Sequence, residues 1–241
     1  MRAILTWHSV DASGSPISVT REEFRRQVRW LASGRVRVVG LEQLLALAPD
    51  TPAVALTFDD GFANFATEAA PLLRQEGFAV TLFVVTGHVG GDNRWSGRQD
   101  PGIPVLPLLD WEALGRLQET GVTLGAHTRS HPRLTRLEAA RLEEELGLPA
   151  EEMERRLGER PAALAYPYGD VDERIAGVAA RWYRFGCTTE LRPLRAAEAP
   201  VRLPRLDAWY FRQPARLEAW ATRRWRAWLW LRRQARRLRG H

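Results

Sequence analysis

Short apolar runs rich in valine, leucine and alanine alternate with amphipathic stretches along most of this 241-residue chain. We expect strands in the apolar runs and helices in the amphipathic ones, an order typical of a parallel sheet. Strands are predicted over residues 3–7, 36–39, 54–58, 80–85, 122–125, 163–165 and 185–188, and helices over residues 21–32, 41–48, 63–76, 110–119, 137–157 and 172–182. The helix over 137–157 is expected to break near Pro149.

Residues with reactive side chains follow several of these strands directly. Asp59 and Asp60 come after the strand over 54–58, and His127 comes after the strand over 122–125. The carboxyl ends of parallel strands meet at one rim, where α/β barrels build their active sites. The sequence therefore predicts an α/β fold, a distorted seven-stranded (β/α) barrel rather than an open sheet.

The two carboxylates and the pair His127 and His131 are the chemically informative residues. One carboxylate and two imidazoles can hold a divalent metal and leave a position open for water, as in a hydrolytic site. The second carboxylate would remain to act as a base. We expect the histidines, four residues apart on one helical turn, to point the same way. The alternatives are an ordinary turn after a strand and a chance pair of surface histidines.

Three segments carry a resemblance to a known family. Residues 57–61 (TFDDG), 127–131 (HTRSH) and 166–169 (YPYG) resemble successive motifs of the polysaccharide deacetylases, which form carbohydrate esterase family 4 and are also called the NodB-homology domain. The resemblance covers roughly residues 3–207. It implies a metal-dependent hydrolase that removes an N-acyl group, expected to be acetyl, from an amino sugar in a polysaccharide or lipid-linked glycan. The alternative is a non-catalytic glycan- or membrane-associated protein with a residual metal site.

The resemblance also implies roles for particular residues. Asp60, His127 and His131 would bind the metal, and zinc is the commonest expectation for mixed nitrogen and oxygen ligands. Asp59 would be the general base. The backbone N–H of Tyr168, together with the metal, would stabilise the oxyanion.

The chain departs from the family pattern in two places. Ala165 stands where the family often has an arginine that pairs with the base, so something else must position that base. Residues 202–207 contain no histidine, although the family often supplies its general acid from the matching motif. His8, at the end of the first strand, is the candidate acid and His88 a weaker one; a rim histidine held by hydrogen bonds is the alternative for His8.

Substrate contacts are assigned to Trp95, Tyr166 and Arg205. Trp95 lies in a long loop over residues 88–107 and would stack on the apolar face of a sugar, unless the loop is a floppy insertion. Arg205 would steady an anionic group or the base, because it cannot donate a proton at neutral pH.

The last thirty residues differ in charge from the rest of the chain. From Arg212 onwards there are ten arginines and one glutamate, a balance of +9 in a chain whose total is +6, which leaves −3 for the remainder. We therefore divide the chain into a barrel over residues 1–211 and a basic Trp/Arg-rich amphipathic helix over residues 212–241.

Tryptophan and arginine on such a helix suit a membrane interface, so peripheral membrane contact through residues 217–241 is expected. The alternative is a last helix packed on the barrel with a solvated basic end. Nucleic acid is disfavoured because no recognition motif accompanies the charge. No apolar stretch after Met1 is typical of a signal peptide, and none elsewhere reaches the length of a spanning helix, which predicts a cytoplasmic location, peripheral at the inner membrane face.

Overall fold

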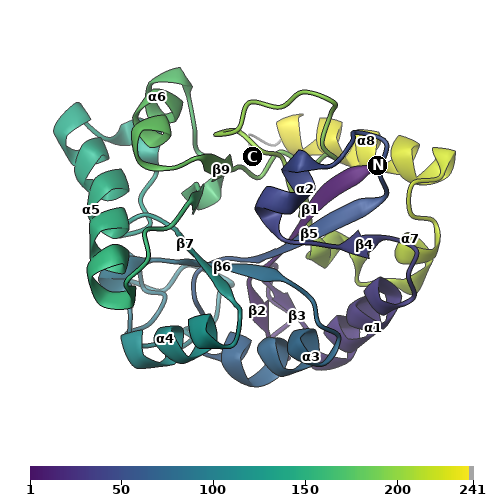
Figure 1. The fold of residues 1–241 in the computed structure, drawn as a ribbon, viewed down its shortest axis with the longest axis horizontal. Helices are drawn as coiled ribbons and strands as arrows, with labels where there is room; N and C mark the ends of the chain where they lie inside the picture. Colours follow the sequence, from purple (N-terminus) through teal and green to yellow (C-terminus); the bar gives the residue numbers. More distant parts are fainter. Residues whose placement is uncertain (239–241) are drawn as a thin grey trace.

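The computed structural model describes residues 1–238 and is built round one curled parallel sheet with a ring of helices outside it (Figure 1). The strands are β1 (Arg2–Trp7), β4 (Arg37–Val38), β5 (Ala53–Phe58), β6 (Val80–Val84), β7 (Thr123–Ala126), β8 (Ala163–Ala165), β9 (Phe185–Cys187) and β10 (Leu206–Asp207), with β2 (Ser9–Val10) and β3 (Ser18–Val19) in a separate pair. The helices are α1 (Arg21–Ala32), α2 (Leu41–Ala46), α3 (Ala70–Gln75), α4 (Trp111–Glu119), α5 (Ala139–Leu157), α6 (Glu173–Trp182), α7 (Pro214–Glu218) and α8 (Arg223–Leu238).

The main sheet confirms the predicted seven-stranded distorted barrel. Seven of its eight strands follow the order β10-β1-β5-β6-β7-β8-β9, and the short strand β4 pairs with the first two residues of β5. Residues 203–207 join the two ends of this curled sheet. The amide of Leu203 donates to the carbonyl of Gly186 at 2.7 Å, while Leu206 pairs with Leu5 in β1. The carboxyl ends of the strands therefore face one common rim.

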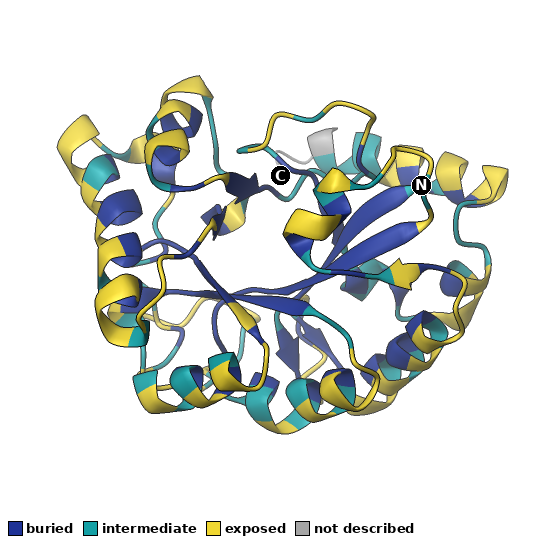
Figure 2. Cartoon of the chain, in the orientation of Figure 1, coloured by how far each residue is buried: buried dark blue, intermediate teal, exposed yellow. Residues whose placement is uncertain are grey.

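Strands β1, β5 and β6 are buried along their whole length (Figure 2), which explains their near-continuous apolar sequences. Alternate residues enter two different apolar clusters, as the period of two in a strand requires. Leu5, Leu56 and Leu82 belong to the larger cluster, which includes most of the helices, whereas Ile4 and Ala55 belong to a smaller cluster that includes α2.

Helix α1 has the predicted bounds because residues within the helix and next to it stabilise it. Thr20 and Glu23 form a reciprocal capping box at its start, and Phe24, Val28 and Leu31 bury one face. The predicted helix over 63–76 is divided into a π-helical segment, η1 (Phe65–Ala69), and α3.

The predicted break near Pro149 was wrong. Helix α5 runs without interruption from Ala139 to Leu157, with Pro149 inside it. Leu146 and Ala150, on either side of the proline, are fully buried. A proline removes one backbone hydrogen bond from a helix. The buried packing of Leu146 and Ala150 therefore stabilises α5 at Pro149, where the helix propensity of the local sequence alone would end it.

The basic C-terminal segment packs against the barrel. Trp225 and Leu229 are buried in the main apolar cluster, and the ring of Trp220 lies 5.1 Å from that of Trp30 in α1. This is the arrangement expected from the packed alternative. The segment forms two helices, α7 and α8, rather than one, and Ala221 between them has a positive φ of 62°.

The outward side of α8 keeps a small apolar surface. Trp230 is 58% exposed and Leu231 is 60% exposed, beside several arginines. Within residues 1–238, no helix combines the length and the apolar character needed to cross a membrane. The predicted boundary at residue 211 stays a prediction.

Candidate metal and active site

The two aspartates follow β5 and the first histidine follows β7, two strands that β6 separates at the same carboxyl rim. The amide of Asp59 donates to the carbonyl of Trp7 at 2.9 Å, and the amide of His127 donates to the carbonyl of Val84 at 2.8 Å. Both contacts continue the strand pairing by one residue. Backbone hydrogen bonds of the sheet therefore fix the positions of Asp59 and His127 at the rim.

Asp60, His127 and His131 converge as the sequence predicted. Oδ1 of Asp60 lies 3.3 Å from Nε2 of His127 and 3.5 Å from Nε2 of His131, and all three residues are buried. Oδ1 of Asp60 has no hydrogen-bond partner within the described residues. A buried acceptor without a partner is costly, and a cation between these three atoms would satisfy it. The donor set of two imidazoles and a carboxylate fits a divalent transition metal.

Hydrogen bonding and burial act differently on the two histidines. Nδ1 of His127 lies 2.7 Å from the carbonyl of Ala165, which places the ring proton there and leaves Nε2 free to face Asp60. Burial alone would lower the pKa of His127, but its contact with Asp60 and the charges of Asp59 and Asp60 together raise that pKa. Burial and the neighbouring charge of His127 lower the pKa of His131 to about 3, which keeps that ring neutral.

The expectation that the two histidines share one helical turn was wrong. Residues 127–131 form an irregular turn in which Thr128 and His131 have positive φ values of 65° and 58°. Asp60 and Tyr168 also have positive φ, at 72° and 60°. Each such non-glycine conformation costs roughly 1–3 kcal/mol and is typical of functional sites.

Glu145, on the buried face of α5, holds the histidine turn in place. Its carboxylate accepts the amides of Arg129 at 3.0 Å and Ser130 at 2.8 Å, and the Ser130 hydroxyl at 2.6 Å. The side chain is fully buried. Our sequence reasoning missed this residue, although a glutamate beside Leu142 and Leu146 on an apolar helix face was the available signal.

Arg205 supplies the partner that the base lacks at Ala165. Its NH1 and NH2 atoms donate to Oδ1 and Oδ2 of Asp59 at 2.6 Å and 2.7 Å, and its side chain is 1% exposed. Burial on its own would raise the pKa of Asp59, but the charge and hydrogen bonds of Arg205, together with the neighbouring histidines, hold that pKa below its usual range. Of the two expected roles of Arg205, the structure has the contact with the base, and the substrate contact is corrected because the guanidinium is buried against Asp59.

His8 lies on the solvent side of the same carboxylate. Its Nε2 is 3.7 Å from Oδ2 of Asp59, and its side chain is 24% exposed. The ring also lines an open cleft at the barrel rim. His8 is therefore close to the base and accessible from solvent, as its position after the first strand predicted.

The long loop folds over the site. Asn93 is buried, donates to the carbonyl of Pro104 at 3.0 Å and accepts the amide of Leu106 at 2.8 Å. These contacts place the ring of Trp95 with its centroid 4.7 Å from that of His131. The ordered contacts disfavour the floppy-insertion alternative for residues 88–107.

The two tyrosines of the third motif lie in different environments. Tyr168 is 44% exposed, and its ring centroid lies 4.8 Å from that of His131. Tyr166 is fully buried and donates its hydroxyl to the carbonyl of Val201 at 2.8 Å. Tyr166 therefore has no surface for a sugar, and its predicted substrate contact is not retained.

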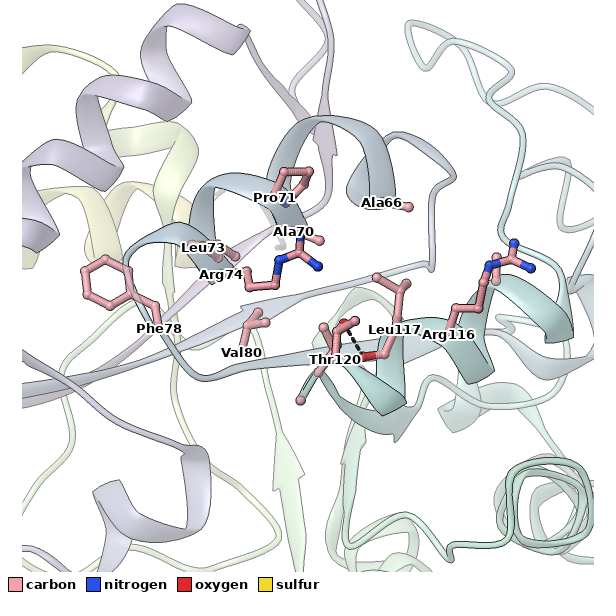
Figure 3. A pocket seen from close by; sticks show the side chains of 13 residues that line it. Ala66, Ala70, Pro71, Leu73, Arg74, Phe78, Val80, Arg116, Leu117 and Thr120 are labelled. Carbon is pink, nitrogen blue, oxygen red and sulfur yellow. Dashed lines mark hydrogen bonds between the residues drawn. The ribbon is translucent and has the colours of Figure 1, made fainter.

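Two hollows differ in their relation to the site. The open cleft at the rim has a volume of about 740 Å³ and is lined by His8 and Tyr168 among others. Figure 3 shows the second, a groove between η1, α3 and α4 that reaches Val80 and Val122, where β6 starts and just before β7. None of the predicted site residues lines this groove, so the rim cleft is the candidate substrate site.

Comparison with known proteins agrees with this geometry. Residues 47–183 match the polysaccharide deacetylase family. The chain is 25% identical over 193 residues to YxkH of Bacillus subtilis (strain 168), provisionally named a polysaccharide deacetylase; the match covers 78% of this chain and 64% of YxkH, less than two thirds of its length. It is 23% identical over 203 residues to the poly-beta-1,6-N-acetyl-D-glucosamine N-deacetylase of Staphylococcus epidermidis, with coverages of 78% and 67%. The deacetylase PplD of Streptococcus pyogenes, solved with acetate, has a similar fold, with a TM-score of 0.73, 22% identity and coverage of 85% of this chain and 91% of PplD.

Proposed function

The chain belongs to the polysaccharide deacetylase family, and we propose that it is a metal-dependent hydrolase that removes an N-acyl group, expected to be acetyl, from an amino sugar in a glycan. The observation that carries the proposal is the convergence of Asp60, His127 and His131 on one point, with Asp59 beside them. The staphylococcal relative is named for N-acetylglucosamine polymers, which makes such polymers the first substrates to test.

Asp60 Oδ1 and the Nε2 atoms of His127 and His131 would hold the metal, with zinc as the expected ion. A bound zinc ion would act as a Lewis acid, polarising the acyl carbonyl and lowering the pKa of a bound water. The two imidazoles and one carboxylate leave the remaining coordination positions for water and substrate.

Asp59 is the proposed general base, which takes the proton of the attacking water. Its depressed pKa keeps it ionised at neutral pH, and the two hydrogen bonds from Arg205 fix the plane of the carboxylate. A general base must be ionised and correctly oriented toward the water, and Arg205 would keep the carboxylate of Asp59 in both conditions.

Tyr168 and His8 complete the proposed machinery. Pro167 fixes the backbone just before Tyr168, whose N–H would donate to the oxyanion as the acyl carbonyl becomes tetrahedral. His8 would protonate the leaving amine, which its exposure and its position beside Asp59 support. Trp95, packed against His131 and partly exposed, would stack on the sugar ring.

We keep peripheral membrane contact in the proposal, but with fewer residues than the range 217–241 expected from the sequence. Trp220, Trp225 and Trp228 pack on or near Phe211, which leaves Trp230 and Leu231 as the large apolar residues exposed on α8 over residues 223–236. An anchor this small would act together with the surrounding arginines on an anionic bilayer.

Release of acetate from N-acetylated oligosaccharides, followed by mass spectrometry, tests the proposed activity. Chelation should abolish release, and zinc or cobalt should restore it. Full activity in protein shown to be metal-free would refute the proposal. Binding of sugars without product over a panel of substrates would instead support the alternative, a non-catalytic glycan-associated protein with a residual metal site.

A further inference from the structure

The rim cleft extends from the proposed catalytic residues to the C-terminal helix. His8 and Tyr168 lie at one part of its wall, and Arg233 and Arg236 of α8 lie at another. Trp225 and Leu229 hold α8 against the barrel, so these two arginines have a fixed scaffold. Four arginines and three carboxylates line the cleft in all.

Each of the three carboxylates accepts hydrogen bonds from groups of the protein itself. Asp170 accepts the amide of Thr135 at 2.9 Å and also the hydroxyl of the same residue. Glu190 pairs with Arg192 at 2.8 Å and also with Arg233. Asp207 accepts the amide of Trp209 at 2.9 Å, and burial raises its pKa. Glu190 is thus paired with arginine, the oxygens of Asp170 and Asp207 accept backbone amides, and four arginines against three carboxylates leave a formal excess of +1 on the walls.

Two of the cleft arginines have no such partner. Within the described part of the chain, no carboxylate oxygen lies within 4.0 Å of the guanidinium of Arg133 or Arg236. The guanidinium of Arg133 lies over the ring of Tyr168, 4.5 Å from its centroid. Arg133 thus places a positive charge without a salt bridge beside Tyr168, whose N–H is the proposed donor to the oxyanion.

From this charge arrangement we propose that the cleft binds an anionic group of the glycan, so that the substrate is an acidic N-acetylated saccharide rather than a neutral one. The inference rests on the proposed deacetylase function and narrows its substrate class. Guanidinium groups bind carboxylate and phosphate with paired hydrogen bonds, and partial enclosure in a cleft strengthens the attraction. Either anion satisfies this chemistry, and the experiment separates them.

The test compares three N-acetylated probes with the zinc-loaded full chain: hyaluronan tetrasaccharide, which bears carboxylates, N-acetylglucosamine 1-phosphate and neutral chitotetraose. We expect kcat/KM at low salt to be at least about tenfold higher for one of the acidic probes than for chitotetraose, equivalent to about 1.4 kcal/mol. Added salt should reduce that preference, because it screens partly exposed charges.

Variants of α8 localise the effect. Arg236→Gln should raise KM for the preferred acidic probe about tenfold and leave chitotetraose turnover unchanged. Arg232→Gln is the matched control, because Arg232 lies on the same helix over the ring of Tyr210 and does not line the cleft. Equal turnover of acidic and neutral probes by the unaltered protein, or an equal loss on both probes in Arg236→Gln, would overturn the proposal.

Binding keeps the proposal testable even if no probe is hydrolysed. Calorimetric titration of Asp59→Asn should show tighter binding of an acidic probe than of chitotetraose, and Arg236→Gln in that background should remove the difference. A loss of deacetylation with this binding preference intact would count against the proposed function alone. Arg236→Gln that weakens binding to anionic vesicles while both acidic probes bind as before would assign the charge to a membrane and reject the glycan proposal.

Discussion

Asp59 and Asp60 are neighbours in the chain, yet they face opposite surroundings. Both oxygens of Asp59 accept hydrogen bonds from Arg205, so each oxygen of this carboxylate has a charged partner. Oδ1 of Asp60 faces two imidazole nitrogens and has no hydrogen-bond partner among the described residues. The difference shows how two identical side chains acquire different chemistry: one is held as a fixed anion, and the other is left needing a cation.

The two environments come from different parts of the fold. Arg205 belongs to the segment that joins the ends of the sheet, 146 residues after Asp59. His131 belongs to the turn after β7 that Glu145 holds from α5. Substitutions can therefore disturb one aspartate and spare the other.

The largest expected effect separates the two aspartates directly. Asp60→Ala should lose bound zinc and activity together, because one of the three ligands is removed. Asp59→Asn should keep zinc and lower kcat/KM by about 10²–10⁴, the usual contribution of a general base. Metal content by mass spectrometry and steady-state kinetics check both. Loss of zinc in Asp59→Asn would show that the two roles are not separate.

Arg205→Met should destabilise the fold by about 3–5 kcal/mol, because it leaves Asp59 buried without its partner. Urea unfolding measures the free energy of unfolding. Arg184→Met is the control, since Arg184 pairs with Glu42 in an exposed position and should change stability by less than about 1 kcal/mol. Equal stability of the two variants would mean that the Asp59 pair contributes no more than a surface pair.

Glu145→Gln should act on the Asp60 side alone. The histidine turn would lose its anionic acceptor, and zinc affinity should fall about 10–100-fold, as for other groups that orient metal ligands. Competition with a fluorescent chelator measures this affinity. Glu144→Gln, on the same helix and half-exposed, is the matched control. Unchanged zinc affinity in Glu145→Gln would show that the turn holds its shape without that carboxylate.

The smallest expected effect is on pH dependence. Because the pKa of Asp59 is depressed in the folded protein, its ionised form stabilises the fold above the unfolded pKa of about 3.9, and this contribution is lost as pH falls through the folded pKa. Without Arg205, burial would raise that pKa. The acid limb of kcat/KM against pH should therefore move up by at least about one unit in Arg205→Met. An unmoved limb would show that Asp59 does not set it.

Most of the fold could be predicted from the sequence because its signals are local. The capping box at Thr20 and the apolar spacing of Phe24, Val28 and Leu31 gave α1 its correct bounds. The buried run of β5 was equally clear. Prediction failed at Pro149 and at the histidine turn, where packing in α5 and contacts with Glu145 outweigh local preference.

The sequence by itself determined the strand order in the chain, the residues that reach the rim and the resemblance of three short motifs, because each depends on neighbours a few residues apart. Only the tertiary structure decided which side chain steadies Asp59, which one supports the histidine turn, and that the tryptophan-rich helix packs on the barrel. Those outcomes depend on the closing of the sheet, which brings together residues that no periodic pattern relates.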